Sequence, residues 1–146
     1  MRQLYLVDNS VLQRLHRSDE VASALVDLLA DGELAGCLPQ LLEEGYSSRS
    51  AADYARIRSA NARAKVFLAP DAEVAHLALD LQRRLFDAGH GRAVGVSDLQ
   101  IAATAIRHST ETQRISVVHY DSDFEHIASV DPEFRHRWIV PRGSVA

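Results

Sequence analysis

The chain has little of what builds disulfide-linked, membrane-spanning or strongly basic proteins. Cys37 is the single cysteine among 146 residues, so no disulfide framework can form, and a reducing, cytoplasmic location is expected. No apolar run approaches the ~18 residues of a membrane span, and we expect neither a span nor a signal peptide. The net charge of −4 argues against a generally basic nucleic-acid binder, but it does not exclude a local basic face.

What is present is typical of one globular domain over residues 1–146, with 47% hydrophobic and 25% charged residues. Short apolar runs alternate with helical segments, which predicts an α/β fold with a mainly parallel sheet. The predicted strands cover residues 4–7, 33–38, 66–69, 115–120 and 138–140. The predicted helices cover residues 11–17, 20–29, 71–88, 97–108 and 123–128, with two more starting near 39 and 51.

Three short segments match the capping box, in which a serine at the start of a helix is followed three residues later by Glu or Gln. An aspartate stands beside each of these serines. Any one such acid could only stabilise a helix, because the helix dipole favours a negative charge at the N-terminus by about 0.3–1 kcal/mol. The three boxes start at Ser10, Ser97 and Ser122, and the acids are Asp8, Asp98, Asp121 and Asp123.

Taken together, the acids predict a metal site. Asp8 and Asp121 each follow a predicted strand, and the carboxyl ends of parallel strands share one edge of the sheet. Asp98 and a glutamate from the helix after Pro39 could converge there. Four carboxylates in one crevice need a compensating cation. Oxygen ligands favour Mg²⁺ or Mn²⁺, and the absence of a second thiol or a zinc-like histidine spacing makes zinc the weaker choice.

Four motifs in this order resemble those of PIN domains, and more closely of VapC-type toxin ribonucleases. They are "YLVDNS" at 5–10, "LEEGYSSRS" at 42–50, "VSDLQIAATA" at 96–105 and "VVHYDSDFEHIA" at 117–128. The resemblance spans nearly the whole chain and implies a three-layer sandwich with helices on both faces of the sheet. It also implies that Asp8, Glu43, Asp98 and Asp121 are the catalytic, metal-binding acids, with Asp123 as an accessory ligand of Mg²⁺ or Mn²⁺.

The glutamate ligand is fixed by the resemblance alone. On a helical wheel, Glu43 and Glu44 flank the apolar face about equally, so periodicity does not choose between them. The family pattern of Leu-Glu-x-Gly ahead of a Ser-Arg segment selects Glu43, which would leave Glu44 solvated or at the rim of the cleft.

The resemblance further implies an endoribonuclease that hydrolyses structured RNA such as tRNA or rRNA, leaving a 3′-hydroxyl and a 5′-phosphate. It implies a homodimer and a cognate VapB-like antitoxin, through which alone the chain would meet DNA. One alternative is a non-catalytic PIN-fold module that binds RNA or protein, but such a module would typically have lost an acid. Another is a phosphotransfer domain with Asp8 as nucleophile, which would want an aspartate at position 10, where Ser10 stands.

Two groups of residues have a structural and a functional interpretation. The basic residues of the alanine-rich segment either hold RNA phosphates or form a solvated helix face. His119 could contact substrate or hydrogen-bond an acid, but a packed strand residue is the preferred interpretation. The basic residues are Arg49, Arg56, Arg58, Arg63 and Lys65, and His90 and Arg92 are further candidates for RNA contact.

Overall fold

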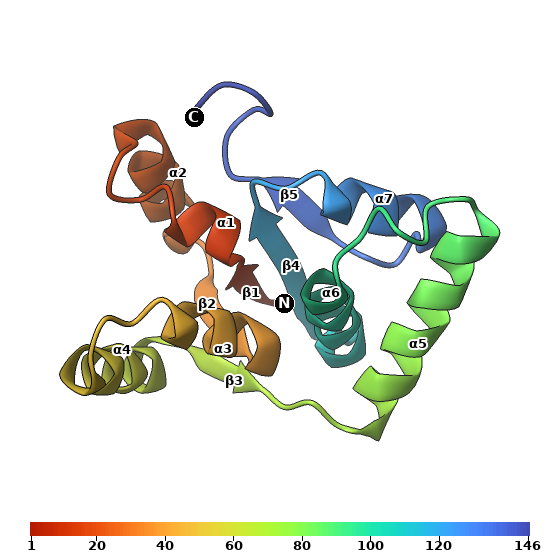
Figure 1. Ribbon diagram of the computed structural model, residues 1–146, viewed down its shortest axis with the longest axis horizontal. Coiled ribbons are helices and arrows are strands. Elements are labelled where there is room, and N and C mark those ends of the chain that lie inside the picture. Colours follow the sequence, from red (N-terminus) through yellow and green to blue (C-terminus); the bar gives the residue numbers. More distant parts are fainter.

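The computed structural model describes all 146 residues and contains a five-stranded sheet between two layers of helices (Figure 1). The strands lie in the order β3-β2-β1-β4-β5, and every neighbouring pair is parallel. The predicted α/β class with a parallel sheet is therefore confirmed. The strands are β1 (Arg2–Val7), β2 (Glu33–Cys37), β3 (Val66–Leu68), β4 (Gln113–His119) and β5 (His136–Trp138).

The helices divide between the two faces. Helices α1 and α2 lie on one side of the sheet, and α5, α6 and α7 lie on the other (Figure 1). Helix α3 directly follows β2, and α4 packs against α3. No helix is both long enough and apolar enough to cross a bilayer. The helices are α1 (Asn9–Leu12), α2 (Asp19–Leu29), α3 (Leu38–Tyr46), α4 (Ala51–Ala64), α5 (Ala72–Asp87), α6 (Val96–His108) and α7 (Asp123–Val130).

The two helix layers pack on opposite faces of β1 because side chains alternate along a strand. Leu4 and Leu6 belong to a cluster of 19 buried residues shared with α5, α6 and α7. Tyr5 and Val7 belong to a cluster of 8 buried residues shared with α1 and α2. The main core therefore lies under α5–α7, and both layers hold the carboxyl end of β1 in place.

The first predicted helix is shorter than expected. Residues 11–17 were predicted helical, whereas α1 ends at Leu12. Beyond it, Arg14 and Leu15 donate to the third preceding carbonyl, which is the tighter pattern of a turn. The last predicted strand is shifted toward the N-terminus, since β5 covers His136–Trp138.

The three predicted capping boxes are wrong. Asp8, not Ser10, caps α1, because its Oδ2 accepts the backbone N–H of Ser10 at 3.1 Å. The hydroxyl of Ser10 instead accepts the backbone N–H of Tyr120 at 2.8 Å, which ties α1 to the end of β4. Helix α6 begins after Gly95 without a side-chain cap, and Ser122 stands before α7 but makes no capping bond.

Candidate metal centre

The four predicted aspartates lie at the carboxyl edge of the sheet or in the first turn of a helix beside it. Asp8 directly follows β1, and Asp121 comes two residues after β4. Asp98 is the third residue of α6, and Asp123 is the first residue of α7. The topological rule for parallel strands explains why residues 8 and 121 come together despite their separation in sequence.

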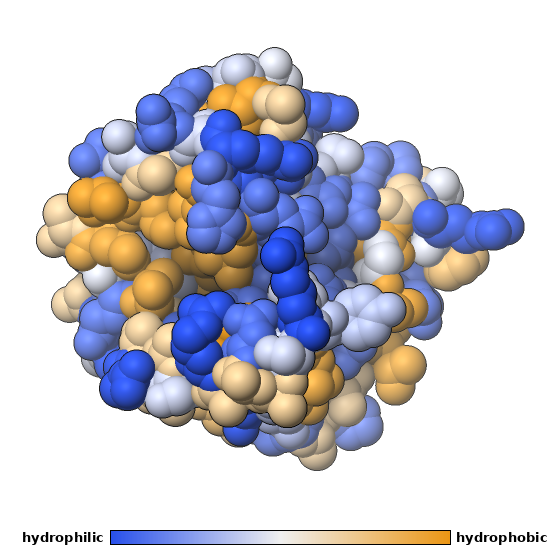
Figure 2. All heavy atoms as spheres, turned by 60° about the vertical axis from the view of Figure 1, so that its left-hand side comes forward, coloured by the Kyte–Doolittle hydropathy of each residue, from blue (hydrophilic) through white to orange (hydrophobic).

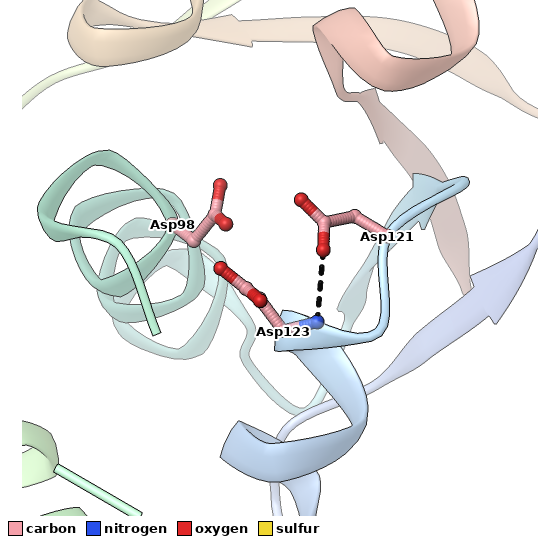
Figure 3. Close-up of side chains that lie close together, drawn as sticks. All are labelled: Asp98, Asp121 and Asp123. Atoms are coloured by element: carbon pink, nitrogen blue, oxygen red, sulfur yellow. Dashed lines mark hydrogen bonds between the residues drawn. The ribbon is translucent and has the colours of Figure 1, made fainter. Parts of the chain in front are cut away.

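Three of these side chains point toward one another (Figure 3). One carboxylate oxygen from each of Asp98, Asp121 and Asp123 lies within 4.8 Å of the others, and all three residues are half-buried. Asp121 Oδ1 accepts the backbone N–H of Asp123 at 2.9 Å, and Asp123 Oδ2 accepts the backbone N–H of Gly95 at 3.1 Å. These bonds fix the start of α7 against the loop that leads into α6.

Asp8 stands beside this group with one oxygen unsatisfied. Its side chain is buried, with only 4% of the residue exposed. Oδ2 is bound by the N–H of Ser10, but Oδ1 is buried and has no hydrogen-bond partner. A buried carboxylate oxygen without a partner is costly, and a cation is one of the few groups that would satisfy it.

The electrostatics of the acids also favour a cation. Burial raises the pKa of Asp8, and the charges of Glu43 and Asp121 raise it further. Burial raises the pKa of Asp98 to about 9, with Asp123 the next contributor. Burial and the charge of Asp123 raise the pKa of Asp121. These neighbouring carboxyl groups cannot all ionise at low cost unless a cation offsets their charge. Because they offer only oxygen ligands, a hard divalent ion such as Mg²⁺ or Mn²⁺ suits them.

The two glutamates of α3 face different neighbours. Glu43 Oε2 accepts from Asn9 Nδ2 at 3.2 Å, next to Asp8. Glu44 Oε1 accepts from Lys65 Nζ at 2.8 Å and from Gln40 Nε2 at 3.0 Å. Glu44 is therefore held in an ion pair, while Glu43 is left on the side of Asp8. This difference between the two glutamates could not be predicted from the sequence, because Lys65 lies 21 residues from its partner Glu44.

A groove of about 970 Å³ lies between α1, α3, α4 and α6, and of the predicted site residues only Glu43 lines it. Figure 2 shows this side of the molecule, where an apolar surface adjoins polar side chains. Asn9 and Ser97, the sequence neighbours of Asp8 and Asp98, also line the groove. Its apolar wall is formed by Leu12, Leu15, Leu38, Leu42 and Ile57.

The basic residues of the alanine-rich segment do not form one face. Arg49 and Arg56 line the large groove, and Arg56 is paired with Asp53. Arg58 and Lys65 line a separate hollow of about 350 Å³. Four of the five basic residues are therefore divided between two hollows, and Arg49 lines the large groove without an ion pair.

Comparison with known proteins matches residues 5–130 to the PIN domain family. The chain is 35% identical over 144 residues to "Ribonuclease VapC21" of Mycobacterium tuberculosis, with 99% of each chain covered. It is 36% identical over 143 residues to "Ribonuclease VapC51" of the same species, covering 97% of this chain and 96% of the relative.

Among solved structures, the VapBC2 complex from Rickettsia felis, bound to a DNA fragment from its promoter, contains a chain of the same fold. The TM-score is 0.70 at 18% identity, with 92% of this chain and 98% of that chain covered. The fold, the acids at the sheet edge and the full-length sequence similarity all indicate the same family. The chain belongs to the PIN domain family, in the group of the VapC ribonucleases.

Proposed function

We propose that the chain is a metal-dependent endoribonuclease toxin that hydrolyses phosphodiester bonds in structured RNA such as tRNA or rRNA. The observation that carries the proposal is the set of acids at one sheet edge, whose pKa values are raised by burial and by one another. A non-catalytic module would have no use for charges held together at this cost. The full-length similarity to VapC ribonucleases supports the same activity.

The residues that would hold the ion are Asp8, Glu43, Asp98 and Asp121, with Asp123 as an accessory ligand. The unpartnered Oδ1 of Asp8 and the three facing carboxylates supply oxygen atoms from three separate segments of the chain. Mg²⁺ and Mn²⁺ both suit this donor set. When bound, a divalent ion makes a coordinated water more acidic and offsets negative charge at the phosphate.

The protein's own groups bind and orient the RNA. Arg49, which lines the groove, binds a backbone phosphate and brings the strand toward the acids. The carboxylate of Asp98 or of Asp121 orients the attacking water. The buried side of the cluster, closed by Asp8 and Asn9, excludes bulk water from the carboxylates.

The partners follow from the same family. The similar Rickettsia felis chain was solved in a complex named VapBC2 and bound to promoter DNA. We infer that this chain pairs with its own VapB-like antitoxin, forms a homodimer and meets DNA only through the antitoxin. The buried, unpaired Cys37 suits the reducing cytoplasm, where such RNA substrates are found.

The direct test is RNA cleavage by protein purified without an antitoxin. Total RNA is incubated with the protein in Mg²⁺ or in EDTA, and the new 5′-ends are sequenced. We expect a few strong cleavage sites bearing 5′-phosphates in Mg²⁺ and none in EDTA. RNA binding without any new 5′-end in either Mg²⁺ or Mn²⁺ would instead support the non-catalytic alternative.

The two glutamates of α3 provide a matched pair of variants. Glu43→Gln is expected to reduce cleavage by more than about 10-fold, because a metal ligand loses its charge. Glu44→Gln should retain cleavage but lower the melting temperature, because the nearly buried Lys65 ammonium loses its anionic partner. Initial cleavage rates and thermal melts of both variants test the assignment, and the reverse order of rates would move the ligand to Glu44.

A further inference from the structure

The chain turns sharply out of the sheet after β4, and side chains hold its backbone there. The N–H of Tyr120 is bound by the hydroxyl of Ser10. The next N–H, that of Asp121, is bound by His119 Nδ1 at 3.1 Å. Asp121 Oδ1 then accepts the N–H of Asp123. The backbone of Asp121 is therefore held by an imidazole nitrogen in place of a strand carbonyl.

The His119 ring is itself fixed from several sides. It is fully buried, and its centroid lies 4.8 Å from that of Phe124 and 5.0 Å from that of Trp138. Its other nitrogen, Nε2, lies 2.8 Å from His136 Nδ1. Packing alone would fix the position of the ring, but the two nitrogen contacts also fix which nitrogen carries the proton.

The hydrogen bonds assign the tautomer. A backbone N–H can only donate, so His119 Nδ1 must be unprotonated to accept from Asp121. The proton of the neutral ring is then on Nε2, which donates to Nδ1 of His136. Because His136 Nδ1 accepts the hydrogen bond from the protonated Nε2, it favours the tautomer of His119 whose Nδ1 can accept from the Asp121 N–H.

We propose that His119 is a positioning residue for the carboxylate of Asp121, with its tautomer set by His136. This inference rests on the proposed function, in which Asp121 binds the metal ion. Holding the Asp121 N–H on Nδ1 keeps the turn in the conformation in which the Asp121 carboxylate faces Asp98 and Asp123 (Figure 3). Without that acceptor, the turn loses the bond that holds the Asp121 backbone, and the carboxylate is oriented only by its bond to the Asp123 N–H in the metal-free protein.

Two amide substitutions separate this role from packing. In His119→Asn the amide oxygen can take the place of Nδ1, whereas in His119→Gln the amide reaches the place of Nε2 and leaves the Asp121 N–H without its acceptor. Both remove the buried ring, so both should melt at lower temperature. We expect Mn²⁺ affinity and cleavage rate to fall about 10–100-fold in His119→Gln, and several-fold less in His119→Asn.

A nitrogen NMR measurement on the wild type tests the inference without any variant. His119 should show an unprotonated Nδ1 and a protonated Nε2 in both the metal-free and the Mg²⁺-loaded protein. The opposite tautomer, or equal losses of Mn²⁺ affinity in the Asn and Gln variants, would overturn the positioning role.

A further variant separates failure of the inference from failure of the proposed function. Asp121→Asn should weaken Mn²⁺ binding whatever His119 does. If the wild type binds no Mn²⁺, or if Asp121→Asn binds it as tightly as the wild type, the metal site itself is wrong, and the inference falls with it. If Asp121→Asn weakens binding but the two His119 variants bind equally, only the inference is overturned.

Discussion

Asp8→Asn is expected to abolish RNA cleavage while leaving the fold intact. We expect a loss on the order of 100-fold or more, because removing groups that merely orient metal ligands already costs about 10–100-fold. Asparagine can still cap α1, since its amide oxygen can accept the Ser10 N–H now bound by Asp8 Oδ2. The measurement is the initial rate of cleavage of the mapped RNA in Mg²⁺ and in Mn²⁺.

The stability of the same variant provides an independent check. Because burial raises the pKa of Asp8 in the folded chain, stability falls as the pH rises from the ordinary aspartate pKa to the raised one, and the loss is complete above the raised pKa. Asparagine carries no such charge, so the metal-free variant should be at least as stable as the wild type at pH 8. Asp27→Asn, on the exposed side of α2, is the matched control and should change neither property. Wild-type cleavage by Asp8→Asn would remove this residue from the site.

The second large effect concerns the two aspartates at the end of β4. In the wild type, Mn²⁺ should raise the melting temperature, since it binds only the folded state; an excess of 100 times the dissociation constant adds about 2.7 kcal/mol. We expect this rise to shrink most in Asp121→Asn. The metal-free form of that variant should melt at or above the wild-type temperature, because burial raises the pKa of Asp121 and its charge disfavours folding.

Asp123→Asn should fail in a different way. Asp123 stands in the first turn of α7 and accepts the Gly95 N–H, so part of its contribution is structural. Loss of its charge at the helix start should lower the free energy of unfolding by about 0.5 kcal/mol. The loss of cleavage activity should be smaller than in Asp121→Asn. Thermal melts with and without Mn²⁺ compare the two variants. If the metal-induced rise shrinks equally or more in Asp123→Asn, Asp123 is a primary ligand.

Much of the fold could be predicted because it depends on local pattern. Apolar runs located all five strands to within a few residues, and the helices predicted over residues 20–29 and 71–88 begin within one residue of the starts of α2 and α5. The meeting of Asp8 and Asp121 also followed, since parallel strands place their carboxyl ends along one edge. These inferences need only periodicity and one topological rule.

What could not be predicted depends on contacts between distant residues. Ser10 matches a capping box, but a backbone N–H 110 residues away takes its hydroxyl. The helical wheel treats Glu43 and Glu44 alike, and only Lys65, beyond α4, separates them. His119 looked like a packed strand residue, and it is one, but its bond to the Asp121 N–H depends on the turn that follows β4.

The two sides of the groove differ in rigidity, because the wall formed by α4 is held less firmly than the wall formed by α6. None of the 14 residues of α4 is buried, and α4 rests on α3, where Tyr54 packs on Gly45 so closely that an added Cβ would lie 3.0 Å from the ring. A helix of this length is marginal in water by itself, so little free energy opposes its local unfolding. Its amide hydrogens should exchange with solvent long before those of α6, which forms part of the opposite wall and is anchored in the main core. The groove can therefore widen by local unfolding of α4 while the acids stay fixed. Binding of a partner in the groove would then carry the entropic cost of ordering α4.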